Sequence, residues 1–198
     1  MIGIILYKVL VLLQPNVRIV DIEKLRFPIG KYAPGEIKFD EIEKWIEDIA
    51  NLPSQLLDVL KDIDVEAMNY TYRPEGWSIR QLIHHLADSH MNAFIRFKLA
   101  LTEDNPTIKP YLEDKWATMH DVKEEPVESS MLILQGVHAR LASVLRDMSV
   151  QEFSRKYTHP EHGRSLDLAF TVGMYSWHGK HHLAHIKSAL KFGRAFWN

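Results

Sequence analysis

The sequence contains no cysteine among its 198 residues. Disulfide bonds and cysteine-ligated zinc sites are therefore excluded, and any metal site must be built from histidine, aspartate or glutamate. A chain without disulfides is compatible with a reducing cytoplasm, which is where we expect this protein to act.

The chain also lacks a strong excess of charge of one sign. Its formal net charge is −2 at pH 7, and no basic stripe or basic arm stands out. Proteins that bind nucleic acids usually carry such a surface because it neutralises phosphates. We therefore expect no nucleic-acid partner.

We expect neither a membrane span nor a signal peptide at the N-terminus. Residues 1–13 are apolar apart from Tyr7 and Lys8, but they fall short of the roughly 20 residues that a helical span needs. They also lack a basic start and a small-residue cleavage site. We expect no membrane partner; the alternative is a protein tethered through residues 1–13, which fractionation would test.

Length and composition predict one globular domain with a sizeable core, since 46% of the 198 residues are hydrophobic. A turn-rich stretch from Phe27 to Gly35 opens this domain, which we place at residues 27–198. Residues 1–26 are interpreted as an N-terminal extension. That extension is either an added strand or helix, or the product of a start codon placed too early.

Apolar residues recur at helical spacing in the first half of the domain and predict two long helices. The first begins with Asp40 as its N-cap and is kinked or broken at Pro53. The second begins after Ser78, which forms a capping box with Gln81, and runs to about Thr102.

Two further helices follow in the second half. The third has Pro126 at its first position, and the last covers about residues 166–192 behind a cap at Ser165 or Asp167. The connection formed by residues 103–125 is rich in proline and charge, and connections of this length are often functional.

The last helix carries four histidines on one face. Since a helix turns by about 100° per residue, these four share about one third of its surface: His178, His181, His182 and His185. Three lysines lie on the opposite side and mark the solvent: Lys180, Lys187 and Lys191. The histidines are therefore predicted to point into the protein.

Inward-facing imidazoles need a partner, because buried polar groups without hydrogen bonds or a metal are costly. Two pairs have the i, i+4 spacing that can converge on one metal ion, His178 with His182 and His181 with His185. The spacing does not choose between these pairs. The alternative to a metal site is a surface run or a set of hydrogen-bonded core histidines.

The second helix carries a polar stripe more than three turns long. Its members are Gln81, His85, Asp88, Ser89, Asn92 and Arg96. On a helical wheel, His85 is only weakly preferred over His84 as the inward-facing histidine of this stripe. Apolar residues cover much of the rest of this helix, so the stripe is predicted to face an internal, partly wet cavity; the alternative is an exposed face.

The remaining histidines are expected to have structural roles or none. His138 lies on the apolar face of the third helix and is interpreted as a hydrogen-bonded core histidine. His159 and His162 flank a turn between two short extended pieces and are expected on the loop surface. The resulting fold class is all-α, a four-helix bundle with a site between its second and last helices and a small hairpin before the last helix.

Several stretches resemble the DinB/YfiT superfamily. Residues 73–92 read RPEGWSIRQLIHHLADSHMN, and IRFKLALTE at residues 95–103 continues the similarity. Residues 177–185 read WHGKHHLAH and resemble the histidine-bearing helix of that family, and FPIGKY at residues 27–32 is similar to its start. The resemblance covers about residues 27–192 and is closest to the YfiT subgroup, which includes bacillithiol transferases and proteins described as metal-dependent hydrolases.

This resemblance implies an up-down-down-up four-helix bundle, a homodimer and one divalent metal ion on three histidines. Carried over by position, those ligands fall on His85, His178 and His182. The family usually has another polar pair at the two positions after His178, but these positions lie off the ligand face. Apolar residues spread around the second helix, such as Phe94 and Phe97, also favour a dimer.

Three neutral imidazoles would leave the ion electrophilic and with an open position, as in catalytic sites. Two reactions follow: hydrolysis with activated water, or transfer of a low-molecular-weight thiol such as bacillithiol to a small electrophile. We favour the thiol S-transferase over the hydrolase, with Zn²⁺ or Ni²⁺ as the expected ion. A non-catalytic, metal-stabilised bundle is the rival from another class.

Overall fold

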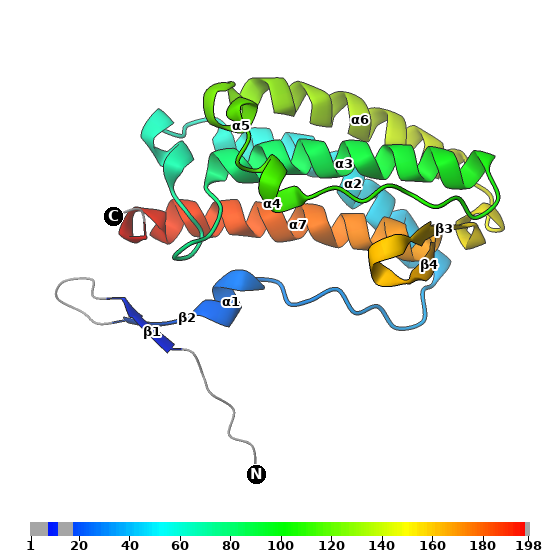
Figure 1. The fold of residues 1–198 in the computed structure, drawn as a ribbon, viewed down its shortest axis with the longest axis horizontal. Coiled ribbons are helices and arrows are strands. Elements are labelled where there is room, and N and C mark those ends of the chain that lie inside the picture. Colours follow the sequence, from blue (N-terminus) through cyan, green and yellow to red (C-terminus); the bar gives the residue numbers. More distant parts are fainter. Residues whose placement is uncertain (1–7, 12–17, 197–198) are drawn as a thin grey trace, which may run out of the picture.

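The computed structural model describes residues 8–11 and 18–196, and its framework is a bundle of four long helices (Figure 1). These are α2 (Phe39–Leu60), α3 (Ile79–Thr102), α6 (Val127–Asp147) and α7 (Leu168–Phe192). Helix α2 packs against α6 and α7, and α3 packs against the same two helices. α2 and α7 run in one direction while α3 and α6 run in the other, which confirms the up-down-down-up topology (Figure 1).

The helix starts follow local chemistry. Ser78 caps α3 and forms the predicted capping box with Gln81, and Asp167 caps α7 by accepting a hydrogen bond from the Phe170 amide. The prediction for the start of α2 was wrong, because Lys38 is the N-cap and Asp40 lies in the first turn.

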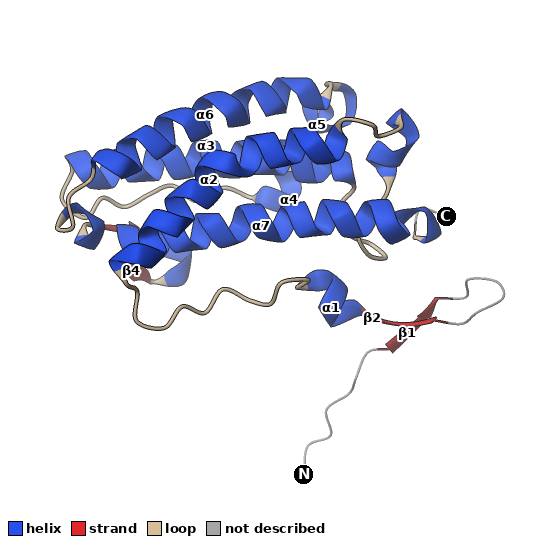
Figure 2. Ribbon diagram, turned by 180° about the vertical axis from the view of Figure 1, so that it is seen from behind, coloured by secondary structure: helices blue, strands red, loops and turns tan. Residues whose placement is uncertain are grey.

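Helix α2 is continuous through Pro53, so of the predicted kink or break at this residue the break does not occur. A proline removes one backbone hydrogen bond from a helix. Here the turns on both sides of Pro53 are anchored in the core by the buried side chains of Ile49, Leu52 and Leu56. Packing on both sides therefore keeps the helix in one piece. In Figure 2, which views the molecule from the side opposite to Figure 1, α2 lies in front of the other long helices.

Parallel neighbours need a long connection, and residues 103–126 supply it between α3 and α6. This segment contains two short helices, α4 (Glu113–Trp116) and α5 (His120–Glu124). The bundle also has short 3₁₀ turns at η1 (Val65–Asn69), η2 (Glu152–Ser154), η3 (Pro160–His162) and η4 (Gly193–Ala195). The predicted hairpin before the last helix is confirmed as antiparallel β3 (Lys156–His159) and β4 (Arg164–Asp167).

The bundle core has two apolar clusters, one towards each end. Phe97 and Leu141 belong to one, and Leu82 and Leu86 to the other. Phe97 is fully buried in its own bundle, so it cannot contribute to a dimer contact as had been expected. Between the clusters the bundle interior is occupied by histidines.

The described part of the N-terminal extension contains both a strand pair and a short helix. Strand β1 (Lys8–Val11) pairs with β2 (Arg18–Asp21), and α1 (Ile22–Arg26) follows. The next residues run along α7 (Figure 1), where the Trp177 indole donates a hydrogen bond to the Gly30 carbonyl and the Tyr32 hydroxyl donates to Phe170.

Within the described residues, no helix has the length and apolar character that a membrane crossing requires. Most of the apolar run at residues 1–13 lies outside the described residues.

Candidate metal centre and adjoining cavity

Two facing helices bring three histidines together. His85 comes from α3, and His178 and His182 come from successive turns of α7. One nitrogen from each imidazole lies within 4.8 Å of the others. His85 Nε2 and His178 Nε2 are 3.2 Å apart, and the His85 and His182 ring centroids are 4.9 Å apart.

Burial keeps these imidazoles neutral. It lowers the pKa of His85 to about 4 and holds the pKa values of His178 and His182 well below the usual range, with smaller contributions from the neighbouring histidines. A neutral imidazole offers one nitrogen lone pair, which is the form that binds metals. The donor set therefore fits a divalent transition-metal ion such as zinc or nickel.

The other i, i+4 pair on α7 is divided between different roles. His185 Nδ1 lies 3.3 Å from His182 Nδ1, and His185 Nε2 lies 3.2 Å from the Arg26 carbonyl oxygen. The carbonyl can only accept, so the proton of neutral His185 sits on Nε2 and its Nδ1 accepts from His182. This tautomer leaves His182 Nε2 as a lone pair.

His181, His182 and His185 also form a compact trio with nitrogens within 4.8 Å of one another. Within this trio His182 is shared with the first cluster and His185 is held by Arg26. His181 stacks on the Trp177 ring at 4.4 Å, and its buried Nδ1 has no hydrogen-bond partner among the described residues.

His90 was missed by the sequence analysis. It is fully buried on α3, and its Nε2 lies 3.1 Å from His178 Nδ1. His90 therefore contacts Nδ1 of His178, the ring nitrogen that points away from the three-histidine cluster. His185 contacts Nδ1 of His182 in the same way. It lies off the polar stripe of α3, so helical spacing alone carried no signal for it.

Three other histidines lie apart from this cluster. The His84 ring hydrogen-bonds Ser130 Oγ on α6 at 2.7 Å, which turns it away from His85. His138 is fully buried and bonds the Ile49 carbonyl, which confirms it as a core histidine. The surface prediction for His159 was wrong, because alternate residues of β3 point inward and His159 is buried against the bundle. The side chain of His162 lies outside what the structure describes.

The polar stripe of α3 is covered, as predicted, and not open to solvent along its length. The Gln81 amide donates to the Ala117 carbonyl in the long connection, and Ser89 and Arg96 are buried. Asp88 is partly buried, and this burial raises its pKa to about 6. The long connection and the stripe therefore enclose the space predicted from the sequence.

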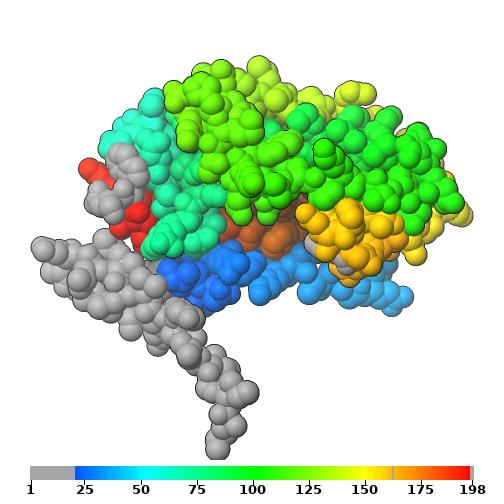
Figure 3. All heavy atoms as spheres, in the orientation of Figure 1, coloured from blue at the N-terminus to red at the C-terminus, as the bar shows by residue number. Residues whose placement is uncertain are grey.

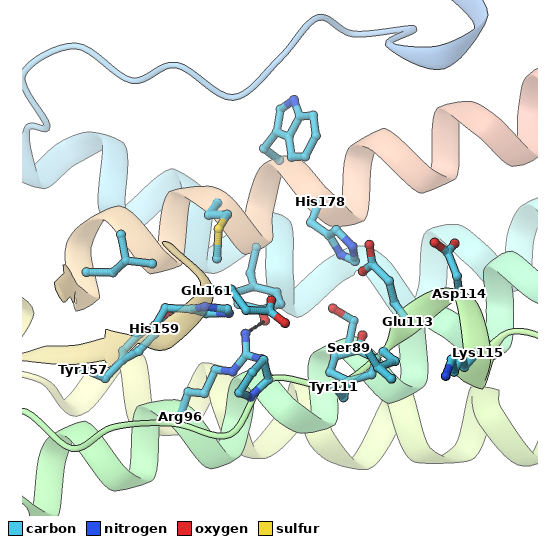
Figure 4. A pocket seen from close by; sticks show the side chains of 16 residues that line it. Ser89, Arg96, Tyr111, Glu113, Asp114, Lys115, Tyr157, His159, Glu161 and His178 are labelled. Carbon is cyan, nitrogen blue, oxygen red and sulfur yellow. Dashed lines mark hydrogen bonds between the residues drawn. The ribbon is translucent and has the colours of Figure 1, made fainter. Parts of the chain in front are cut away.

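That space is a cavity of about 570 Å³ beside the histidine cluster. His178 forms part of its wall, and its other lining groups include Ser89, Arg96, Tyr111, Glu113, Tyr175 and Glu161. Figure 4 shows the labelled side chains converging from α3, α7, the long connection and the β3–β4 hairpin. In Figure 3 the same region is a hollow between the connection (green) and the hairpin (orange), with α7 at its floor.

Comparisons with known proteins agree with this geometry. The family described as the DinB superfamily matches residues 49–186. A protein of Bacillus cereus (strain B4264) named "Putative metal-dependent hydrolase" is 45% identical over 168 residues, which cover 84% of this chain and 96% of that protein. A protein of Oceanobacillus iheyensis with the same designation is 47% identical over 167 residues, again 84% and 96% of the two chains.

Solved structures match as well. YfiT from Bacillus subtilis, described as "a probable metal-dependent hydrolase with an unusual four-helix bundle topology", is 38% identical with a TM-score of 0.82, over 85% of this chain and 97% of that one. A mycothiol-dependent maleylpyruvate isomerase is 19% identical with a TM-score of 0.59, over 73% and 60%, and shares the fold.

Proposed function

The chain belongs to the DinB superfamily, and on that premise we propose that it is a metal-dependent enzyme whose single divalent ion is held by His85, His178 and His182. The observation that carries the proposal is the convergence of three buried, neutral imidazoles from two facing helices on one point. Zn²⁺ and Ni²⁺ are the ions that we expect there.

We propose further that the reaction is transfer of a low-molecular-weight thiol, such as bacillithiol, to a small electrophile. An ion on three imidazoles supplies positive charge that lowers the pKa of a thiol bound to it. The thiol sulfur would then form the new bond to the electrophile, while the electrophile's leaving group departs with the electron pair of the broken bond or, in an addition, a π bond opens; the thiol proton passes to solvent or to the group that received the electron pair. The chain has no cysteine of its own, so no protein thiol competes for the ion.

The side chains around the cluster hold it in a fixed, sheltered arrangement. Contacts from His90 and His185 orient the two α7 imidazoles, as partners of metal-binding histidines do in other proteins. The Trp77 ring lies 4.7 Å from the His85 ring and shields it from water. The cavity beside His178 gives the substrate access from one side.

Metal-dependent hydrolysis is the second candidate, and the designations of the relatives favour it. The two are separated by incubating metal-loaded protein with bacillithiol and a fluorogenic electrophile, beside esters, amides and phosphoesters. We expect thiol conjugation that is metal-dependent and faster than any hydrolysis. Rapid metal-dependent hydrolysis without conjugation above the uncatalysed rate would reverse the order of the two candidates.

Ligand identity is tested separately by metal analysis of alanine variants. Replacing His85, His178 or His182 should empty the site. His84→Ala and His181→Ala are matched controls, since each removes a neighbouring buried histidine, and both should retain the ion. The assignment is wrong if the controls lose the metal while the three variants keep it.

A chelator distinguishes an enzyme from a metal-stabilised bundle. Both core clusters consist of hydrophobic side chains and none of the three proposed ligands belongs to them, so we expect the metal-free protein to stay helical near neutral pH. Loss of helical circular dichroism on metal removal at pH 7.5 would favour a structural ion.

We also propose a homodimer that acts in the cytoplasm on small molecules, without a nucleic-acid or membrane partner. Apolar side chains on the outer surfaces of α3 and α6 support the dimer. Ile95 is 50% exposed and Leu132 is 69% exposed, and a second copy could cover them.

A further inference from the structure

Arg96 is a buried cation that faces the cavity. Its side chain is on α3, the residue is only 8% exposed, and it lines the cavity together with His178. A guanidinium keeps its charge at any ordinary pH and presents five N–H donors. A charge in that position needs a compensating partner, since burying it alone is unfavourable.

The described residues do not supply an anionic partner. Arg96 Nη1 donates a hydrogen bond to the Tyr175 hydroxyl at 3.2 Å, and among the ion pairs of the described residues none includes Arg96. Burial raises the pKa of Tyr175 and raises that of Tyr157 to about 12, so both phenols are neutral.

Carboxylates do line the same cavity, but at its outer side. Glu161 is exposed, and Glu113 and Asp114 belong to the short helix α4 in the long connection. None of them lies within ion-pair distance of Arg96 in the described residues. Lys115 is exposed and lines the cavity as well, so the exposed rim carries three carboxylates and one ammonium group and is acidic on balance, whereas Arg96 is a buried cation.

The Tyr175 side chain links Arg96 to the histidine cluster. The Tyr175 ring centroid lies 5.9 Å from that of His178, and the Tyr175 hydroxyl is the group that Arg96 contacts. A small molecule lying across Tyr175 can therefore reach both ends of the cavity.

We propose that Arg96 binds a carboxylate of the thiol substrate while the sulfur of that same molecule lies at the histidine cluster. The assignment rests on the proposed function for the position of the sulfur. A carboxylate suits the planar guanidinium fork, and the acidic rim disfavours ligands of higher negative charge such as phosphate esters. We assign the carboxylate to the thiol and not to the electrophile. The thiol is the substrate that contacts the histidine cluster and so fills the buried part of the cavity, whereas the electrophile enters from the exposed rim.

The test uses thiols that differ only in this carboxylate. A series of ω-mercaptocarboxylic acids of increasing chain length is titrated into cobalt-loaded protein beside the matching methyl esters, and the sulfur-to-cobalt charge-transfer absorption reports binding. At the chain length that spans the cavity, we expect the acid to bind about 10- to 100-fold more tightly than its ester, as one charge-assisted pair provides.

Variants then identify the residue responsible. Arg96→Gln should bring the affinity of the acid down to that of the ester and leave the ester unchanged, whereas Arg96→Lys should keep part of the preference. Glu161→Gln is the matched control at the rim and should keep or increase the preference for the acid. If Arg96→Gln does not fold, the wild-type comparison and Arg96→Lys still decide.

The outcomes separate this inference from the proposed function. Thiols that bind with equal affinity as acid and ester at every length overturn the Arg96 site while the metal-bound thiol stands. If no thiol binds, the proposed function fails, and hexanoate with metal-free protein decides the Arg96 site. The site is supported if hexanoate raises the melting temperature, hexanol does not, and Arg96→Lys weakens the effect. The site is overturned if hexanoate causes no such rise.

Discussion

Acidification should unfold the metal-free protein unusually early. Eight histidines have pKa values lowered by burial: His84, His85, His90, His138, His178, His181, His182 and His185. The unfolded chain protonates these imidazoles near pH 6.5, whereas folded His85 and His181 do so only near pH 4. The unfolded state therefore binds more protons, so stability present above pH 6.5 is lost as the pH falls towards 4.

The magnitude follows from the number of groups. At pH 5.5, one pH unit below its unfolded pKa, each such histidine lowers the free energy of unfolding by about 1.4 kcal/mol. If only half of the eight stay unprotonated in the folded state, the free energy of unfolding falls by about 6 kcal/mol. The whole stability of a domain is about 5–15 kcal/mol, so metal-free protein should be close to unfolding at that pH.

Urea denaturation followed by circular dichroism at pH 7.5, 6.5, 6.0 and 5.5 measures this effect. The slope of the unfolding free energy against pH gives the number of protons taken up on unfolding, and we expect several. His181→Phe should lower that number by about one, because burial lowers the pKa of His181 to about 4. An uptake of less than one proton between pH 6.5 and 5.5 would refute the reasoning.

Three further predictions concern packing, metal affinity and assembly. A Cβ on Gly173 would clash with the Tyr32 hydroxyl and meet the Trp45 ring at 2.7 Å, so Gly173→Ala should lower the unfolding free energy by about 1–3 kcal/mol. Gly136→Ala, which meets nothing within 4 Å, should instead raise it by about 0.5–1 kcal/mol, and urea melts compare the two. His185→Phe keeps an aromatic ring but removes the hydrogen bond to His182, so chelator competition should show about 10- to 100-fold weaker metal binding with unchanged stoichiometry. Light scattering should show a dimer, and a mass near 23.0 kDa across micromolar concentrations would contradict it.

Features that depend on neighbouring residues were predictable from the sequence. The Ser78 capping box, the Asp167 cap and the inward side of the α7 histidines follow from side chains within one or two helical turns. The same locality explains why a break at Pro53 could not be excluded from the sequence, because burial of both adjoining turns keeps α2 continuous and helical spacing alone does not report that burial.

Features that depend on distant residues were not predictable in this way. The choice between the two α7 histidine pairs depends on the Arg26 carbonyl, 159 positions away from His185. His90 was missed because its role is set by His178, 88 positions along the chain. His159 was wrongly expected at the surface, since the packing of a short strand against the bundle decides which of its sides is buried. The assignment of the metal ligands themselves stays a prediction.

The histidine cluster also has a consequence for the order of folding. His85 and His178 are 93 positions apart, and α6 lies between them in the chain. Bringing them together in an unfolded chain carries the full entropy of closing that loop, whereas His178 and His182 are adjacent as soon as one helix forms. An ion that meets the nascent chain can therefore engage at most the α7 pair, and the third histidine becomes available only when α3 and α7 have docked. Acquisition of the metal would then come late, as the step that reports a completed bundle.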